Sequence, residues 1–339
     1  MRDLGEEEFF FEKKNQKTFI CCGQHGCSVF ARQSEKFFAS FFQKRSLPFS
    51  ASRCAARPAR TLLWLLLLSI TPARADQPWM RLPPTPVLPP ADHAGLAPIN
   101  GILLWHAEFG EGKPDPVVLL HGGLANANYW GKLVPVLART HEVIVLDSRG
   151  HGRSSRNATP IGYELMASDA VALLDRLHIE RAAIVGWSDG AITGLEIALH
   201  HPERLTGLFA FAANSDPSGV KDVHASPVFS AFIARAAGEY RQLSPTPNGY
   251  AAFEADIEKM WAREPNMSDA TLRSIKARVW IVDADHDEAI TRANTDHMAT
   301  LIPDAREMIL PGVSHFAFLQ DPDMFCFTVT HFLTEKEEE

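Results

Sequence analysis

Short, continuous apolar runs recur along residues 95–334, and helical patterns separate them. Runs of this length, bounded by turn residues, are typical of strands that are buried on both faces of a sheet. The apolar runs lie at 116–121, 142–146, 182–187, 205–211 and 279–282. The helical patterns lie at about 129–139, 163–178 and 189–200. This alternation predicts an α/β fold, with a mostly parallel sheet covered by helices on both faces.

Two further segments extend this pattern. Residues 101–108 alternate moderately between apolar and polar and predict an early antiparallel strand. A long insertion, at about 215–275, separates the last two of the predicted strands and is rich in helix formers and aromatic residues. Helical patterns at 228–243 and 249–263 predict two helices in this insertion.

The residues Gly-Trp-Ser-Asp-Gly at 186–190 form a G-x-S-x-G motif between a strand pattern and a helix pattern. A serine on such a turn presents its hydroxyl at the positive end of the following helix. Glycines flank it because a side chain there would collide with the neighbouring strand and helix. This context predicts that Ser188 is a nucleophile.

Three other polar segments follow apolar runs of strand type: those at 116–121 and 279–282, and a further short run at 308–310. The polar segments are His-Gly-Gly-Leu at 121–124, Asp-Ala-Asp-His-Asp-Glu at 283–288 and Pro-Gly-Val-Ser-His at 311–315. In open parallel sheets, ligands bind beyond the carboxyl ends of the strands, so we expect these segments to lie together there. Serine, aspartate and histidine follow each other in an order that is known for the Ser-His-Asp triad.

These motifs resemble those of the α/β-hydrolase fold family, and the resemblance covers roughly residues 95–334. HGG, LDSRGHGRS (146–154), GWSDG, DADHDEAI and GVSHF stand where members carry their signatures. The elbow looks like that of the valacyclovir-hydrolase (biphenyl hydrolase-like) branch. The layout is also similar to enol-lactone hydrolases and small carboxylesterases. The resemblance implies that the insertion at 215–275 is a helical cap that shapes the substrate pocket.

A serine hydroxyl is a weak nucleophile unless a base takes its proton. His315 is the best candidate for this base because it follows a predicted strand in a Gly-Val-Ser-His loop. His121 competes in principle. The resemblance implies instead that His121 is structural and lies beneath the loop that supplies the oxyanion hole.

Several aspartates could orient the imidazole of that histidine. Asp283, Asp285 and Asp287 share one loop after a predicted strand. The family pattern of this loop selects Asp287, with Asp285 as the alternative. Asp216 follows the preceding strand, at another position where the fold is known to carry the acid.

The oxyanion hole needs two backbone N–H groups. We expect them from Asp189, which follows the nucleophile, and from Gly123, with Leu124 as the alternative donor and a substrate contact. The side chain of Asp189 has two interpretations. In the resembling branch this aspartate is associated with the ammonium group of aminoacyl esters. Alternatively, it caps the helix that follows, where acidic side chains are favoured.

Together these residues indicate a serine hydrolase that acts on a small ester, lactone or aminoacyl ester through an acyl-enzyme. Carbon–carbon bond hydrolysis and cofactor-free haloperoxidase-type activity are the enzymatic alternatives. A hydrolase-fold protein that binds a small molecule is the alternative outside enzymes. We expect no cofactor and, because no Cys/His spacing suggests a metal site, no metal.

Charge and cysteine content differ between the two ends of the chain. Residues 1–75 carry a net charge of +6 and the remainder −14, within a total of −8. An acidic globular part argues against nucleic acid or an anionic membrane as a partner, so we expect a small-molecule substrate. Cys326 is the one cysteine after residue 75, and its apolar surroundings predict a buried core residue.

The first 94 residues suggest a leader and a linker. Residues 57–75 contain a basic segment, an apolar core and an Ala-Arg-Ala sequence, which together are typical of a signal peptide. This pattern predicts export to the periplasm or medium, with cleavage after Ala75. After cleavage, we expect no stable association with the membrane. Without use of this leader, the protein would be cytoplasmic. Residues 1–56 are expected to be an over-extended start or untypical leader, or else a targeting extension. The proline-rich residues 76–94 predict an extended tether.

Overall fold

The computed structural model describes residues 77–335. Within them an 8-stranded sheet has the order β1-β2-β4-β3-β5-β6-β7-β8. Its strands are β1 (His93–Ile99), β2 (Ile102–Phe109), β3 (Val117–Leu120), β4 (Val143–Leu146), β5 (Ala182–Trp187), β6 (Leu205–Phe211), β7 (Val279–Ala284) and β8 (Ala305–Leu310). β1 pairs with β2 and β2 with β4 in antiparallel fashion, and the other pairs are parallel. The predicted mostly parallel sheet is therefore confirmed.

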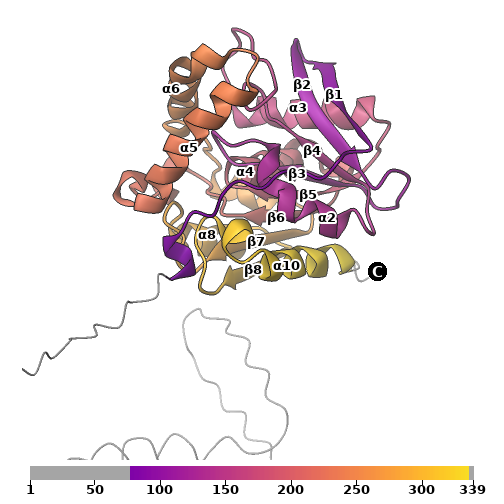
Figure 1. The fold of residues 1–339 in the computed structure, drawn as a ribbon. Coiled ribbons are helices and arrows are strands. Elements are labelled where there is room, and N and C mark those ends of the chain that lie inside the picture. Colours follow the sequence, from indigo (N-terminus) through magenta and orange to yellow (C-terminus); the bar gives the residue numbers. More distant parts are fainter. Residues whose placement is uncertain (1–76, 336–339) are drawn as a thin grey trace, which may run out of the picture. The chain divides into compact units, whose positions relative to one another are not determined.

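Helices connect these strands (Figure 1). The α-helices are α2 (Val134–Leu137), α3 (Tyr163–Arg176), α4 (Asp189–His200), α5 (Pro227–Leu243), α6 (Tyr250–Trp261), α7 (Asp269–Ser274), α8 (Arg292–Leu301), α9 (Ala317–Gln320) and α10 (Pro322–Thr334). Short 3₁₀ helices are η1 (Pro78–Met80), η2 (Ala127–Lys132), η3 (Pro202–Arg204), η4 (Pro217–Gly219), η5 (Val223–Ala225) and η6 (Pro247–Gly249).

Helices cover both faces of the sheet, as two consecutive residues of β6 show. A Cβ atom on Gly194 of α4 would lie only 2.4 Å from Cδ1 of Leu208, so α4 packs closely on that side chain. The ring of Phe209 contacts Phe325 of α10, with centroids 5.8 Å apart. Successive side chains of a strand point to opposite faces, so α4 and α10 lie on opposite sides of the sheet. Cys326 is buried on α10, as predicted.

The helix predicted at about 129–139 is divided in the structure. Residues 127–132 form the 3₁₀ helix η2, and α2 begins only at Val134. Pro135 has no N–H, and its ring would clash with the carbonyl of Gly131 in a continuous α-helix. Gly131 is itself a poor helix former. The apolar period is the same on both sides of the break, which is why the pattern alone predicted one helix.

The proline-rich segment is bound to the body rather than being a tether. Its backbone carbonyls at Leu82 and Pro83 accept hydrogen bonds from Arg235 of α5, at 3.0 and 2.6 Å. The Trp79 ring stacks on His286, with centroids 3.8 Å apart. β1 then begins at His93 and was not predicted, whereas the antiparallel strand predicted at 101–108 is β2. Figure 1 shows this segment, in indigo, crossing from the cap helices towards β1. Composition predicted its extended backbone but not its docking partners.

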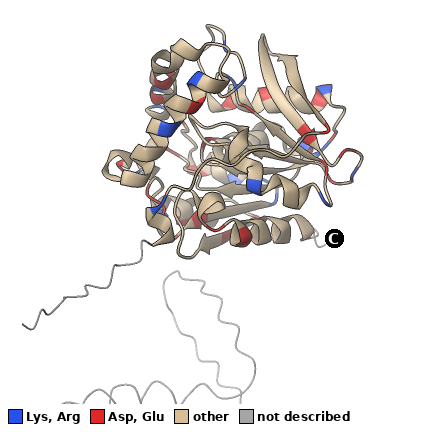
Figure 2. Cartoon of the chain, viewed as in Figure 1, with Lys and Arg blue, Asp and Glu red and all other residues tan. Residues whose placement is uncertain are grey.

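The insertion between β6 and β7 forms the predicted helical cap. Its two long helices, α5 and α6, lie side by side, with the Tyr240 and Phe253 rings stacked 5.0 Å apart (Figure 1). α5 begins where the sequence would place it, because the Ser226 side chain accepts a hydrogen bond from the Phe229 N–H and Pro227 occupies the first turn. Figure 2 shows acidic and basic residues interspersed on these helices, whereas the central strands carry few charges.

The helices were also compared with the length and hydropathy that a membrane span requires. No helix in residues 77–335 is long and apolar enough to cross a membrane. The leader predicted at 1–56, the signal peptide at 57–75 and Asp76 lie outside the described residues.

Candidate active site

Ser188 occupies the turn between β5 and α4, with φ 54° and ψ −118°. A positive φ is unfavourable for a residue with a side chain, and such strain persists only when the surroundings impose it. Here the Ser188 N–H donates to the carbonyl of Phe211 on β6, at 2.8 Å. The flanking glycines permit the turn: a Cβ on Gly190 would lie 2.1 Å from the carbonyl oxygen of Leu120 on β3. The serine is thus held in a strained turn at the carboxyl end of the sheet.

His315 and Asp287 form a buried pair. The ring Nδ1 of His315 lies 2.8 Å from Oδ2 of Asp287, and the two residues are only 1% and 4% exposed. The other carboxylate oxygen accepts the N–H groups of Ala289 and Ile290, each at 2.7 Å. Burial alone would raise the pKa of Asp287, but the His315 charge and these hydrogen bonds hold it below its ordinary value. Asp287 is therefore an ionised acceptor at neutral pH, which favours an Nδ1–H donor on His315.

Carboxylates around His315 favour its protonated form. Burial would lower the pKa of the imidazole, but the charge and hydrogen bond of Asp287, followed by the charge of Glu288, outweigh it and raise the pKa above its ordinary value. Glu288 also fixes the loop, because its carboxylate accepts the backbone N–H of His315 at 3.0 Å. An imidazole that gains a proton readily and keeps its orientation suits a general base.

The imidazole packs against Trp187, the chain neighbour that precedes Ser188, and against a ring of the cap. Its ring centroid is 5.7 Å from that of Trp187, the residue before the serine. On its other side the Phe229 ring of α5 is 5.6 Å away. The charge of His315 also acts on the carboxylate of Asp189, the residue after the serine. The cap therefore contributes an aromatic wall to the space beside the elbow.

The other candidate acids have different partners. Asp285 accepts the N–H of Gly312 at 2.8 Å and is exposed. Asp216 caps η4 by accepting the N–H of Ser218 at 2.9 Å. Asp283 is buried and accepts the Thr295 hydroxyl at 2.8 Å. Burial, and then the charge of Asp287, raise the pKa of Asp283 to about 8, so this carboxyl is protonated at neutral pH. Of the four aspartates, Asp287 is the one hydrogen-bonded to His315.

The loop after β3 passes over the elbow. A Cβ on Gly122 would lie 3.2 Å from Cβ of Ser188. Leu124 is buried and has a φ of 62°, so the chain turns sharply just after Gly123. In residues 77–335, the N–H groups of Gly123 and Asp189 take part in no backbone hydrogen bond of a turn, loop or cap. Two N–H donors therefore remain beside the serine.

His121 is engaged in holding this loop. Its Nδ1 donates to the carbonyl of Gly122 at 2.8 Å, and its Nε2 accepts the N–H of Ser148 at 3.0 Å. Burial lowers the pKa of the imidazole, which keeps the ring neutral. Both ring nitrogens are occupied, so His121 has no free position for a proton from Ser188.

The carboxylate of Asp189 turns toward the cap. It accepts hydrogen bonds from the hydroxyl of Tyr163 at 2.9 Å and from the indole N–H of Trp261 at 2.9 and 3.0 Å. Asp189 lies in the first turn of α4, where an acidic side chain is favoured, but the hydrogen bonds of its carboxylate go to Tyr163 and Trp261 and not to an N–H of that helix. The sequence analysis missed both donors, since a tyrosine and a tryptophan on predicted helices carry no motif.

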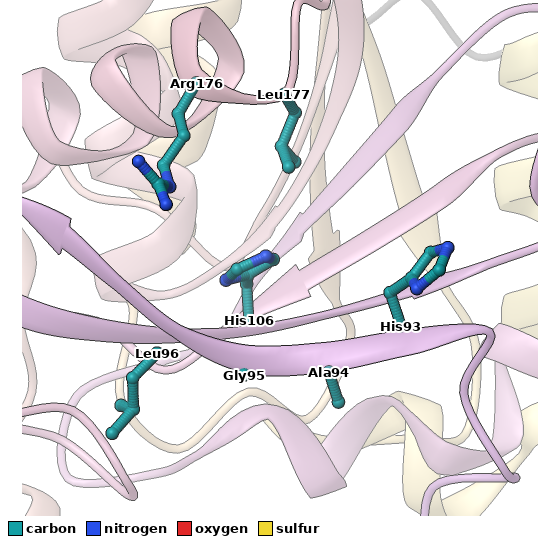
Figure 3. A pocket seen from close by; sticks show the side chains of 7 residues that line it. All are labelled: His93, Ala94, Gly95, Leu96, His106, Arg176 and Leu177. Carbon is teal, nitrogen blue, oxygen red and sulfur yellow. The ribbon is translucent and has the colours of Figure 1, made fainter.

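Two surface cavities lie away from these residues. One, of about 510 Å³, lies between β1, β2 and the end of α3, where the side chains of His93, His106 and Arg176 surround it (Figure 3). The other, of about 620 Å³, lies between residues 156–161 and α6. Neither is lined by Ser188, Asp287 or His315. Ser188 itself is partly exposed, whereas His315 is buried.

The described part of the chain was also searched for side chains arranged as metal ligands. No group of three or more His, Cys, Asp or Glu in residues 77–335 is arranged to hold a metal ion.

Comparison with known proteins places this geometry in context. A family model described as the alpha/beta hydrolase fold matches residues 115–243. A pimeloyl-[acyl-carrier protein] methyl ester esterase of Edwardsiella ictaluri is 28% identical over 260 residues, which cover 68% of this chain and 96% of the relative. A putative carbamate hydrolase RutD of Caulobacter segnis is 29% identical over 236 residues, 62% of this chain and 88% of the relative.

Solved structures show the same similarity. The enol-lactonase from Burkholderia xenovorans LB400 superposes with a TM-score of 0.58 at 25% identity, covering 71% of this chain and 100% of that one. Est816, described as an N-acyl homoserine lactone degrading enzyme, gives a TM-score of 0.54 at 26% identity, covering 72% and 100%.

Proposed function

Because this chain is a hydrolase built on the α/β-hydrolase fold, we propose that it cleaves small esters, lactones or aminoacyl esters through Ser188, His315 and Asp287. The observation that carries the proposal is the buried Asp287–His315 hydrogen bond beside the strained serine turn. The relatives named as a methyl ester esterase and an enol-lactonase support the choice of ester and lactone bonds.

Acylation would begin with attack of the Ser188 oxygen on the substrate carbonyl carbon while Nε2 of His315 takes the hydroxyl proton. The carbonyl oxygen becomes negatively charged and would accept the N–H groups of Gly123 and Asp189. Collapse of this intermediate breaks the bond to the leaving alkoxide, to which His315 returns the proton. The products of this half are an alcohol and an acyl-Ser188 ester.

Deacylation would repeat these steps with water. His315 takes a proton from the water molecule, whose oxygen attacks the acyl carbon, and the proton then passes to the Ser188 oxygen as the ester bond breaks. Asp287 stays ionised throughout and stabilises the imidazolium. Its low pKa, which the histidine charge and two backbone N–H groups maintain against burial, suits this role.

Ser188→Ala tests the proposal in the full-length protein. We expect turnover of a panel of p-nitrophenyl, lactone and aminoacyl esters to fall by a factor of about 10⁴–10⁶, with the fold unchanged. Labelling by a fluorophosphonate should be lost as well. Ser274→Ala, at an exposed serine of α7, is the matched control and should behave as wild type. Retention of a tenth of the activity by Ser188→Ala would refute the assignment.

Two other reactions use the same residues. Carbon–carbon bond hydrolysis of a dienoate and cofactor-free haloperoxidase-type activity should be assayed with the same variants. Turnover of a dienoate far above that of every ester would replace the ester proposal, while the role of Ser188 would stand.

A further inference from the structure

Asp189 places a carboxylate beside the proposed oxyanion hole. It is the first residue of α4, and its backbone N–H is one of the two proposed donors. Its side chain is only 6% exposed. An ionised carboxylate repels a developing oxyanion, and burial strengthens the repulsion because water no longer screens it. The hydrogen-bond partners of this side chain must therefore offset its charge if the oxyanion is to be stabilised.

Two donors from different parts of the chain bind that carboxylate. Tyr163, at the start of α3, donates its hydroxyl to Oδ1 at 2.9 Å. Trp261, the last residue of α6, shares its indole N–H between Oδ1 and Oδ2, at 2.9 and 3.0 Å. Burial raises the pKa of Asp189 to about 6, whereas both donors act against this rise by stabilising the charged form. The carboxylate is thus mostly ionised at neutral pH.

The same tryptophan also contacts the other side of the proposed oxyanion hole. A Cβ on Gly123 would lie 2.4 Å from Oδ2 of Asp189 and 2.5 Å from Cζ2 of Trp261. The carboxylate, the indole ring and the Gly123 backbone therefore touch one another. A displacement of the indole would free space at both proposed oxyanion donors.

The end of α6 is tied to the start of α3 by a second bond. The carboxylate of Glu264, three residues beyond Trp261, accepts the backbone N–H of Tyr163 at 3.1 Å. Trp261 is thus held at a point where the cap is anchored to the body. Its indole N–H links this attachment point of the cap to Asp189, the residue that follows the proposed nucleophile.

We propose that Trp261 is a positioning residue, which acts through Asp189: its indole N–H fixes the carboxylate in one orientation beside Gly123 and offsets its charge there, and so makes full activity depend on a docked cap. This inference rests on the proposed serine hydrolase function. Without the indole donor, the carboxylate beside Gly123 would lose its fixed orientation and part of the compensation of its charge, and it would oppose the oxyanion more strongly. Loss of oxyanion stabilisation raises the energy of the transition state and not that of the bound substrate, so it should lower kcat and leave KM nearly unchanged.

Trp261→Phe removes the donor and keeps an aromatic ring. With a neutral ester, kcat should fall by about tenfold or more, as expected for loss of a hydrogen bond to a charged group, while KM changes by less than about threefold. Trp280→Phe is the matched control. Trp280 is the second residue of strand β7, and its indole N–H also donates to a carboxylate, that of Glu335, at 3.1 Å. Neither residue belongs to the proposed site, so kcat of this variant should stay within about twofold of wild type.

The double variant separates positioning from general destabilisation. In an Asp189→Ala background, Trp261→Phe should cause no further loss of kcat, because the residue through which it acts is gone. Tyr163→Phe, which removes the other donor to Asp189, should also reduce kcat, but by less than Trp261→Phe. This variant replaces the double-variant test if Asp189→Ala does not fold. The inference would be overturned if kcat of Trp261→Phe equalled that of wild type. It would also be overturned if the fold loss in kcat of the double variant equalled the product of the losses of the two single variants. Ser188→Ala keeps the two proposals apart: if it is inactive while Trp261→Phe equals wild type, only the positioning role fails.

Discussion

The protonation state of His315 sets when the proposed site can act. The imidazole must be neutral to take the serine proton, so activity is present above its pKa and is lost as the pH falls through that value. Neighbouring carboxylates raise this pKa above its ordinary value against the effect of burial. For a substrate without a titratable group, the acid limb of kcat/KM should therefore have its midpoint above pH 6.5.

Glu288→Gln provides the internal comparison for this pH profile. It removes one of the negative charges that raise the pKa of His315. The acid limb should then move to lower pH. A wild-type midpoint below pH 6, or a limb unaffected by this change, would contradict the role of His315 as base.

The carboxylate of Asp189 is predicted to favour substrates with a free amino group near the carbonyl. It has about four acceptor positions, and only two donors, the Tyr163 hydroxyl and the Trp261 indole N–H, bind to it. A carboxylate and an ammonium about 4 Å apart attract by on the order of 4 kcal/mol at an effective dielectric constant of about 20, before desolvation. We expect kcat/KM for an aminoacyl ester to exceed that of its N-acetyl analogue by one or two orders of magnitude.

Asp189→Asn decides that preference, because it removes the charge and keeps the shape. The ratio of the two kcat/KM values should fall toward one in the variant. A ratio near one in the wild type, or one that the substitution leaves unchanged, would remove the aminoacyl-ester interpretation and leave a general esterase or lactonase.

At the scale of elements, residues 77–92 join the cap to the body. Arg235 of α5 donates to two carbonyls of this segment, and the neighbouring carboxylate of Glu239 accepts the Thr85 hydroxyl and the Asn126 amide of the loop after β3. Arg235→Ala should lower the free energy of unfolding by about 1 kcal/mol and increase proteolysis within 77–92. Arg241→Ala, an exposed residue near the end of the same helix, should do neither. Equal cleavage patterns in the two variants would show that the segment is held by other contacts.

The elements were predictable where local chemistry determines them. The buried strands were predicted because continuous apolar runs suit a sheet covered on both faces. The single helix predicted at 129–139 was wrong because apolar periodicity does not register the effect of Pro135 on a helix interior. The docking of 77–92 was not predictable, since proline content sets the backbone conformation but not the carbonyl's partner on α5.

At the scale of the whole molecule, the leader leads to a prediction about export. Residues 57–75, which lie outside the described residues, have the charge and hydropathy pattern of a signal peptide. The exported protein should begin at Asp76. Intact-mass measurement of protein from its native cell tests this, with a cytoplasmic fraction as the control. A product that retains 57–70 would exclude cleavage behind Ala75.

The sequence alone determined the features that short segments encode. A strand, a glycine-flanked serine and a helix define the turn at Ser188, because only glycine tolerates the close approach of the neighbouring backbone. The placement of polar residues after apolar runs likewise indicated which edge of the sheet carries the chemistry.

Only the tertiary structure decided which of those residues meet. His315 and Asp287 are 28 positions apart, and Asp283 and Asp285 share the same loop, so the choice among them depends on the path of the chain between two strands. Trp261 reaches Asp189 across 72 positions, through a cap helix whose docking no local pattern encodes. Hydrogen bonds between distant segments form where packing brings donors and acceptors together, and packing is a property of the whole fold.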